Sequence, residues 1–178
     1  MASWQLDFTK APDQVLLDQI NHDNASSLTL ALISFGIPTA ATGTNPNPDT
    51  QITVSAQAGS GYTGSVVVGY NRVLLSTIPG ARSTEYAKGS AANISDLIPE
   101  INTAYQINLT AAEYTDGPLP VFSGGIPNEQ HNFQVAAQAD SVVYEGVMTL
   151  VVKANDIPLS SVITTPTLTG LVYVQPSS

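Results

Sequence analysis

Two histidines and a scatter of carboxylates are the side chains of this sequence that could do chemistry. Asp18 and His22 stand four positions apart on an expected helix, and together with Asp23 they could share a metal ion. An isolated trio of this kind on a solvated helix face is far more often plain surface. The sequence therefore predicts neither a metal site nor a cofactor.

Residues 59–64 match the glycine pattern G-x-G-x-x-G and follow an expected strand. A dinucleotide site also needs a helix that opens at the last glycine, because the N-terminus of that helix holds the pyrophosphate. Here the sequence SVVV follows at 65–68, which is typical of a strand. We therefore interpret the segment as a hairpin loop.

Four aspartates in or beside expected loops could contribute to a calcium site: Asp49, Asp96, Asp116 and Asp156. No EF-hand spacing occurs, and helix capping and turn formation explain these side chains more simply. Glycoside hydrolysis needs a carboxylate pair, usually with aromatic platforms for the sugar, and the chain has one Trp. Cysteines and a G-x-S-x-G elbow are absent. We expect no catalytic residue, and a protein that is not an enzyme.

The composition is low in charge and acidic. Charged residues are 11% of the 178 residues, where an ordinary soluble domain has about 25%. Neutral polar groups cost less to desolvate than ions, so such a surface suits contact with other subunits. The net charge is −9, and the part from residue 93 onward carries −7, from eight acids and one base. Nucleic acid would require clustered Lys and Arg, so we do not expect it as a partner.

Nothing in the sequence suggests a membrane-spanning segment or a secretion signal. No apolar run approaches the ~20 residues that cross a bilayer. The first ten residues lack the basic region and apolar core of a secretion signal. We expect a protein made in the cytoplasm, with no membrane partner.

The main organising feature is an internal repeat with an offset of 81 residues. Sixteen of the 51 positions from 16 to 66 are identical to the residue 81 positions later, where chance would give roughly four. His22 and His131 have threonines at the matching positions, so the histidines are not part of the shared design. After about residue 66 the register fails, which indicates a short insertion in one repeat.

Each repeat predicts a helix, a strand, a long loop rich in Pro and Gly, and two further strands. Leu16, Leu17 and Ile20 form the apolar helix patch of the first repeat. The second patch consists of Leu97, Ile98, Ile101 and Tyr105. The expected strands are 27–34, 51–58, 65–75, 132–139 and 147–154.

We expect an α+β fold that is β-rich overall, with two tandem copies of a helix-plus-antiparallel-strands unit. The strand in the second repeat that contains Glu113 should be more exposed than its counterpart in the first. The expected boundaries are an N-terminal arm at 1–11, a first repeat at 12–79, a linker at 80–92, a second repeat at 93–163 and a C-terminal strand or tail at 164–178.

Both ends of the chain lie outside the repeat and alternate large apolar residues. Such a segment could dock on a neighbouring subunit by strand addition, or each could cover its own sheet. The candidate subunit-contact residues are Trp4, Leu6, Phe8, Leu171 and Tyr173.

The segments LLDQIN, SLTLALISFGIP and SGYTGSVVVGYNRVLL resemble segments in virion structural proteins of large tailed bacteriophages, where a helix-plus-β module recurs singly or in tandem. The resemblance is best over residues 12–78 and reaches the second repeat through DLIPEIN and VVYEGVM. It implies a component of the tail, baseplate, fibre-attachment region or head surface. It carries over no functional residues.

The expected function is therefore that of a non-enzymatic assembly protein of a tailed phage virion, in the tail, baseplate or fibre-attachment region. Its expected partners are further copies of itself and other virion structural proteins. One alternative is a capsid decoration or head-fibre base protein. Another is a carbohydrate- or calcium-binding adhesion module.

Overall fold

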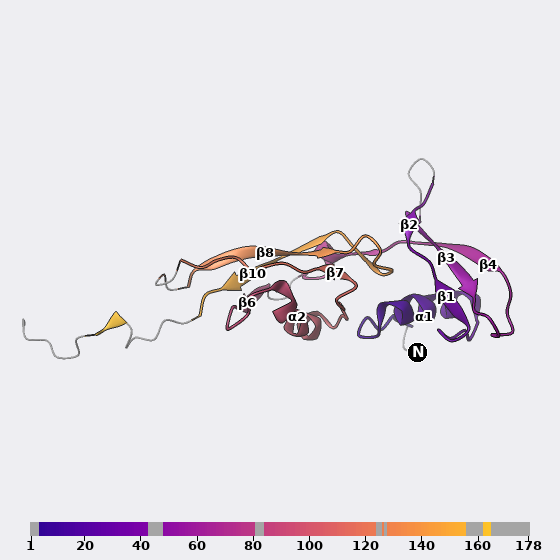
Figure 1. The fold of residues 1–178 in the computed structure, drawn as a ribbon, viewed down its shortest axis with the longest axis horizontal. Helices are drawn as coiled ribbons and strands as arrows, with labels where there is room; N and C mark the ends of the chain where they lie inside the picture. The colour runs from indigo at the N-terminus through magenta and orange to yellow at the C-terminus, as the bar shows by residue number, and fades with distance from the viewer. Residues whose placement is uncertain are drawn as a thin grey trace, which may run out of the picture.

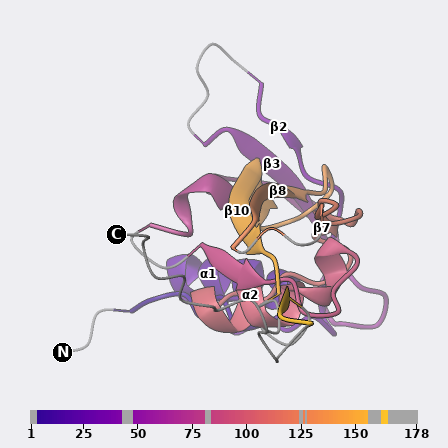
Figure 2. The same cartoon turned by 90° about the vertical axis from the view of Figure 1, so that its left-hand side faces the viewer.

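In a computed structural model the chain forms an elongated molecule with two units along its length (Figure 1). The N-terminal unit comprises α1 and β1–β4, and the C-terminal unit comprises α2 and β6–β10. Both helices lie on the same side of the strands in two perpendicular views (Figures 1 and 2). The structure describes residues 4–42, 48–80, 84–123, 126, 128–155 and 162–164.

The N-terminal unit is an antiparallel sheet covered by one helix. The strand β3 is central: β1 and β2 pair with one of its edges and β4 with the other. The elements are α1 (Pro12–Asn24), β1 (Ile33–Phe35), β2 (Thr39–Ala40), β3 (Thr50–Ala56) and β4 (Ser65–Tyr70).

The C-terminal unit has the strand order β6-β10-β8-β7, in which only β6 is parallel to its neighbour. A separate pair joins β5 (Val73–Leu74) to β9 in parallel. The remaining elements are η1 (Leu75–Thr77), β6 (Glu85–Ala87), η2 (Ile94–Asp96), α2 (Ile98–Tyr105), β7 (Tyr114–Thr115), β8 (Gln130–Ala137), β9 (Tyr144–Glu145) and β10 (Val147–Lys153).

The apolar helix patches of the sequence analysis are confirmed as core. All seven of their side chains are buried. Pro12 opens α1, where its missing N–H costs nothing. Both helices end in a residue with left-handed backbone, Ala25 after α1 and Gln106 after α2. The described part of the chain holds no helix with the length and apolar character to span a membrane.

The prediction of a strand at 27–34 is largely wrong. The region forms a turn, and β1 starts only at Ile33. The backbone of Leu28 is bonded to the side chain of Asn21, and the N–H groups of Leu32 and Ile33 both donate to the carbonyl of Thr29. Since those groups are already used, they cannot join a ladder. Leu28 and Leu32 pack against the core from the turn, and Leu30 is exposed.

Three further regions differ from the expected structure. Glu113, expected to be exposed, is buried within the C-terminal unit. The run expected as one strand at 65–75 is two strands, β4 and β5, which belong to different sheets. The predicted linker at 80–92 includes β6, which pairs with β10.

Candidate functional site

A pair of asparagines makes the same contact in both units. The side-chain amide of Asn21 donates to the carbonyl of Leu28 at 2.9 Å, and its oxygen accepts the Leu28 N–H at 2.8 Å. Asn102 bonds in the same way to Leu109, at 3.1 and 2.9 Å. Both asparagines and both leucines are 81 positions apart, and each asparagine ties the end of its helix to the following turn.

The strand pairs that follow also correspond. Ile33 pairs with Ala56 in the N-terminal unit, and Tyr114 pairs with Ala137 in the C-terminal unit, again 81 residues on. Beyond the hairpin the spacing becomes 82. Ala56 donates its N–H to the carbonyl of Gly64, and Ala137 donates to Gly146. The second hairpin is therefore one residue longer, and the spacing changes between residues 56 and 64, earlier than the position near residue 66 expected from the sequence.

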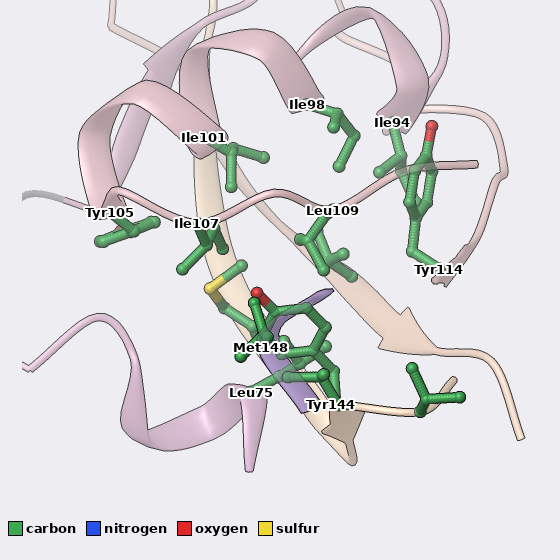
Figure 3. Close-up of a cluster of buried hydrophobic side chains, with 14 of the residues drawn as sticks. Leu75, Ile94, Ile98, Ile101, Tyr105, Ile107, Leu109, Tyr114, Tyr144 and Met148 are labelled. Carbon is green, nitrogen blue, oxygen red and sulfur yellow. The ribbon is translucent and has the colours of Figure 1, made fainter. Parts of the chain in front are cut away.

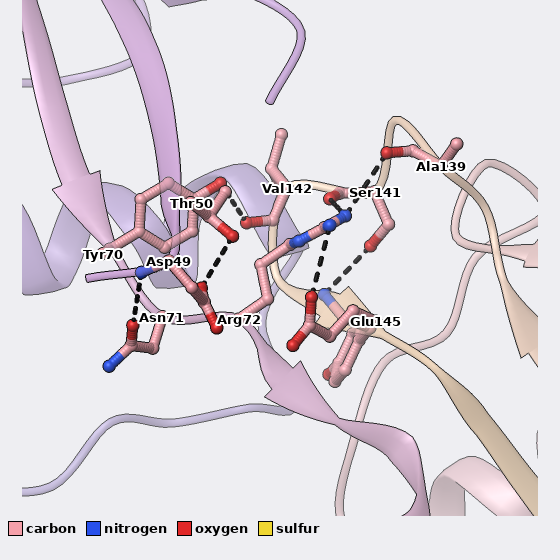
Figure 4. A network of polar contacts seen from close by, with 10 residues as sticks. Asp49, Thr50, Tyr70, Asn71, Arg72, Ala139, Ser141, Val142 and Glu145 are labelled. Carbon is pink, nitrogen blue, oxygen red and sulfur yellow. Dashed lines mark hydrogen bonds and ion pairs between the residues drawn. The ribbon is translucent and has the colours of Figure 1, made fainter. Parts of the chain in front are cut away.

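The junction between the units is built by residues 71–80, here called the junction segment. The Tyr70 hydroxyl donates to the carbonyl of Val142 at 2.8 Å (Figure 4), and burial raises the pKa of this hydroxyl to about 12. Arg72 forms an ion pair with Glu145 at 3.3 Å and donates to the carbonyls of Ala139 and Ser141. These bonds fix the path of the chain as it leaves β4.

The junction segment then fills a groove in the C-terminal unit. Val73 donates its N–H to the carbonyl of Val143 at 2.8 Å and starts the β5–β9 pair. Leu75 is 0% exposed and belongs to the same buried cluster as Met148 (Figure 3). Six apolar residues of the C-terminal unit have apolar counterparts in the N-terminal unit, and all six are buried: Ile101, Leu109, Val135, Tyr144, Met148 and Leu150.

The corresponding groove of the N-terminal unit is open. It has a volume of about 500 Å³. Val66 is 58% exposed there, whereas its counterpart Met148 is 0% exposed, and Tyr62 is 56% exposed against 1% for Tyr144. The six lining residues that correspond to those above, at spacings of 81 or 82, are Ile20, Leu28, Val54, Tyr62, Val66 and Val68. We call this surface the open groove.

Gly64 and Gly146 show the same contrast at one point. Both have positive φ, +84° and +75°, which suits the tight end of a hairpin. A methyl group placed on Gly146 would lie 3.3 Å from the Leu74 side chain, whereas one on Gly64 would meet nothing within 4 Å. The backbone of the open groove therefore offers the space that Leu74 occupies in the C-terminal unit.

The trio that could have bound a metal does not converge on one point. Asp18 accepts from Lys10 and Gln14, each at 2.7 Å. His22 contacts Asp23 at 3.0 Å and stacks on the ring of Trp4, with ring centres 3.7 Å apart. Within the described ranges, no group of three or more His, Cys, Asp or Glu side chains could hold a metal ion.

The loop aspartates act as local caps. Asp96 accepts the backbone N–H groups of Ala92 and Asn93, and these bonds hold the pKa of its carboxyl below the ordinary value. Asp116 accepts the N–H groups of Ser95 and Gly117, with the same effect on its pKa. Asp49 accepts from the Thr50 hydroxyl. Asp156 lies outside the described residues.

One buried polar pair was not predicted from the sequence. Ser141 donates its hydroxyl to Glu113, and the hydroxyl oxygen accepts the Tyr144 N–H at 3.0 Å. Burial raises the pKa of the Glu113 carboxyl. Both side chains are buried and committed to each other, so the pair holds the second hairpin on the turn before β7. The counterparts of this pair are Leu32 and Ser60, so the repeat itself gave no signal for it.

The predicted subunit-contact residues of the N-terminal arm lie against α1. Trp4 is half-exposed on His22, while Leu6 and Phe8 are half-buried against the core. No strand forms over the described residues of the arm. Leu171 and Tyr173 lie outside the described residues.

The chain belongs to a family of unknown function, DUF7941, whose model matches residues 5–178. Neither a curated protein nor a solved structure matches the sequence.

Proposed function

We propose that this protein is a non-enzymatic structural subunit of a tailed phage virion, in the tail, baseplate or fibre-attachment region. We further propose that its two units are tandem copies of one module. The resemblance of residues 12–78 to virion structural proteins supports the first part. The asparagine contacts and strand pairs that recur at a spacing of 81 residues support the second.

The observation that carries the proposal is the open groove. Exposed apolar side chains rimmed by polar residues are typical of a surface that binds another chain or a ligand. Its lining combines aliphatic side chains and Tyr62 with small neutral polar side chains, and it contains no carboxylate, imidazole or amine. Such a surface can bind an apolar segment, but no carboxylate, imidazole or amine lies in its lining to act as a general base. A surface that binds another chain in this way suits a role in assembly.

The location of the protein in a purified particle tests this function. Antibody labelling of intact virions, viewed by electron microscopy, should place the label on the tail or baseplate. Label on the head would favour a capsid decoration or head-fibre base protein instead. Virions that lack the protein by mass spectrometry would contradict a structural role.

A further inference from the structure

We infer that the open groove binds the C-terminal segment of a second molecule of the same chain, so that molecules join head to tail. This inference names the partner in the assembly role proposed above and rests on it. The open groove is the counterpart of a groove that the junction segment fills within the chain. The occupant should therefore resemble the junction segment in sequence and follow the strand that corresponds to β4.

Residues 155–162 meet both conditions. At a spacing of 84 they match residues 71–78: NRVLLSTI aligns with NDIPLSSV. Asn, Leu and Ser are identical at three positions, and three others change only from Val to Ile, Thr to Ser and Ile to Val. Leu159 aligns with Leu75, whose side chain is buried against the C-terminal unit. The segment begins two residues after the end of β10, whereas the junction segment begins directly after β4, and these two strands correspond.

The main difference between the segments is compatible with the proposed pairing. Pro158 replaces Leu74, and proline cannot donate a backbone hydrogen bond. In the β5–β9 pair the donor is Val73, whose N–H binds Val143. The N–H of the next residue points to the opposite edge of the strand, so a proline there loses no bond to the partner strand. Ile157, at the position of Val73, keeps its N–H.

The positions of β10 and Asn155 favour binding of the segment to a second molecule. β10 starts next to the junction and runs away from it for seven residues, roughly 20 Å. Asn155 is held at the far end of the C-terminal unit, where its side chain donates to the carbonyl of Gly89 at 2.9 Å. The helix α1 and the strands β3 and β4, which line the open groove, lie on the other side of the junction (Figure 1). A contact that repeats the junction between molecules is heterologous, and it builds a ring or a filament.

Disulfide trapping tests this inference, because the chain has no cysteine of its own. Within the chain, Leu74 is paired with Glu145. The corresponding positions are Pro158 and Thr63, which neighbouring strands would bring within disulfide range. We expect the double variant Thr63→Cys/Pro158→Cys to form a ladder of covalent dimers and higher multimers under mild oxidation. The ladder should vanish when Leu159→Asp is added.

Two matched variants make the result decisive. Leu74→Cys/Glu145→Cys should form a disulfide within each chain and shows that the pairing geometry permits the bond. Val67→Cys/Pro158→Cys should give no ladder, because Val67 alternates with Val66 and does not line the open groove. Free thiols in the test variant, or a disulfide within one molecule, would overturn the inference. The purified protein is used alone, so this result is independent of where the protein lies in a virion.

Discussion

Glu113 shows how one residue distinguishes the two units. Its counterpart Leu32 needs no polar partner, whereas the buried carboxyl of Glu113 requires the Ser141 hydroxyl. The raised pKa of Glu113 means that the folded protein holds this proton more tightly than the unfolded chain does. The stabilisation from the protonated form is complete below the ordinary pKa and is lost as the pH rises through the raised one.

We expect Glu113→Gln to stabilise the protein at neutral pH, because the amide keeps an acceptor for Ser141 and removes the charge. Near pH 4 the variant and the natural protein should have similar free energies of unfolding. Urea unfolding at several pH values measures both. Glu100→Gln on the exposed face of α2 is the control and should change little. A variant that is less stable than the natural protein at neutral pH would mean that the ionised carboxylate is the favoured form.

Among the elements, η1 anchors the junction segment in the core of the C-terminal unit. Leu75 is fully buried, whereas its neighbour Leu74 is 47% exposed. We expect Leu75→Ala to lower the free energy of unfolding by about 2–5 kcal/mol, because it leaves a cavity in the core of the C-terminal unit. Leu74→Ala should cost less than about 1 kcal/mol. Chemical denaturation of both variants checks this difference, and equal effects would contradict the packing described for η1.

The helices and hairpins were the most predictable elements, for local reasons. The spacing of Leu16, Leu17 and Ile20 marks a buried helix face, and the run SVVV after Gly64 excludes a helix and so predicts a hairpin. Residues 27–34 do not form the expected strand because the side chain of Asn21 bonds to the backbone of Leu28, seven residues further along the chain. Periodicity over a short window cannot detect such a contact.

The candidate site was less predictable than the fold. Val66 and Val68 read as an ordinary strand face, and only the three-dimensional comparison with Met148 and Leu150 shows that one groove is filled and the other open. The match between 71–78 and 155–162 has a spacing of 84, not 81 or 82, so it falls outside the main repeat. Its meaning depends on knowing what Leu75 does in the structure.

On the scale of the whole molecule, the N-terminal unit has the open groove, and the chain after β10 has a segment whose sequence suits it. Two complementary variants separate the groove from the segment. Leu159→Asp should disable the segment and leave the groove intact, and Val66→Asp should disable the groove and leave the segment intact. Val66 is well exposed, so the second change should not unfold the sheet. Val67→Asp, at a similarly exposed position on the other face of β4, is its control.

The most direct measurement is light scattering of these two variants, alone and as an equimolar mixture. Each variant alone should remain a monomer, while the natural protein and the Val67→Asp control form larger species. The mixture should give a heterodimer and nothing larger, because only one intact groove and one intact segment can meet. A mixture that stays monomeric while the natural protein associates would contradict head-to-tail assembly through the open groove, and so would a natural protein that remains monomeric at all concentrations.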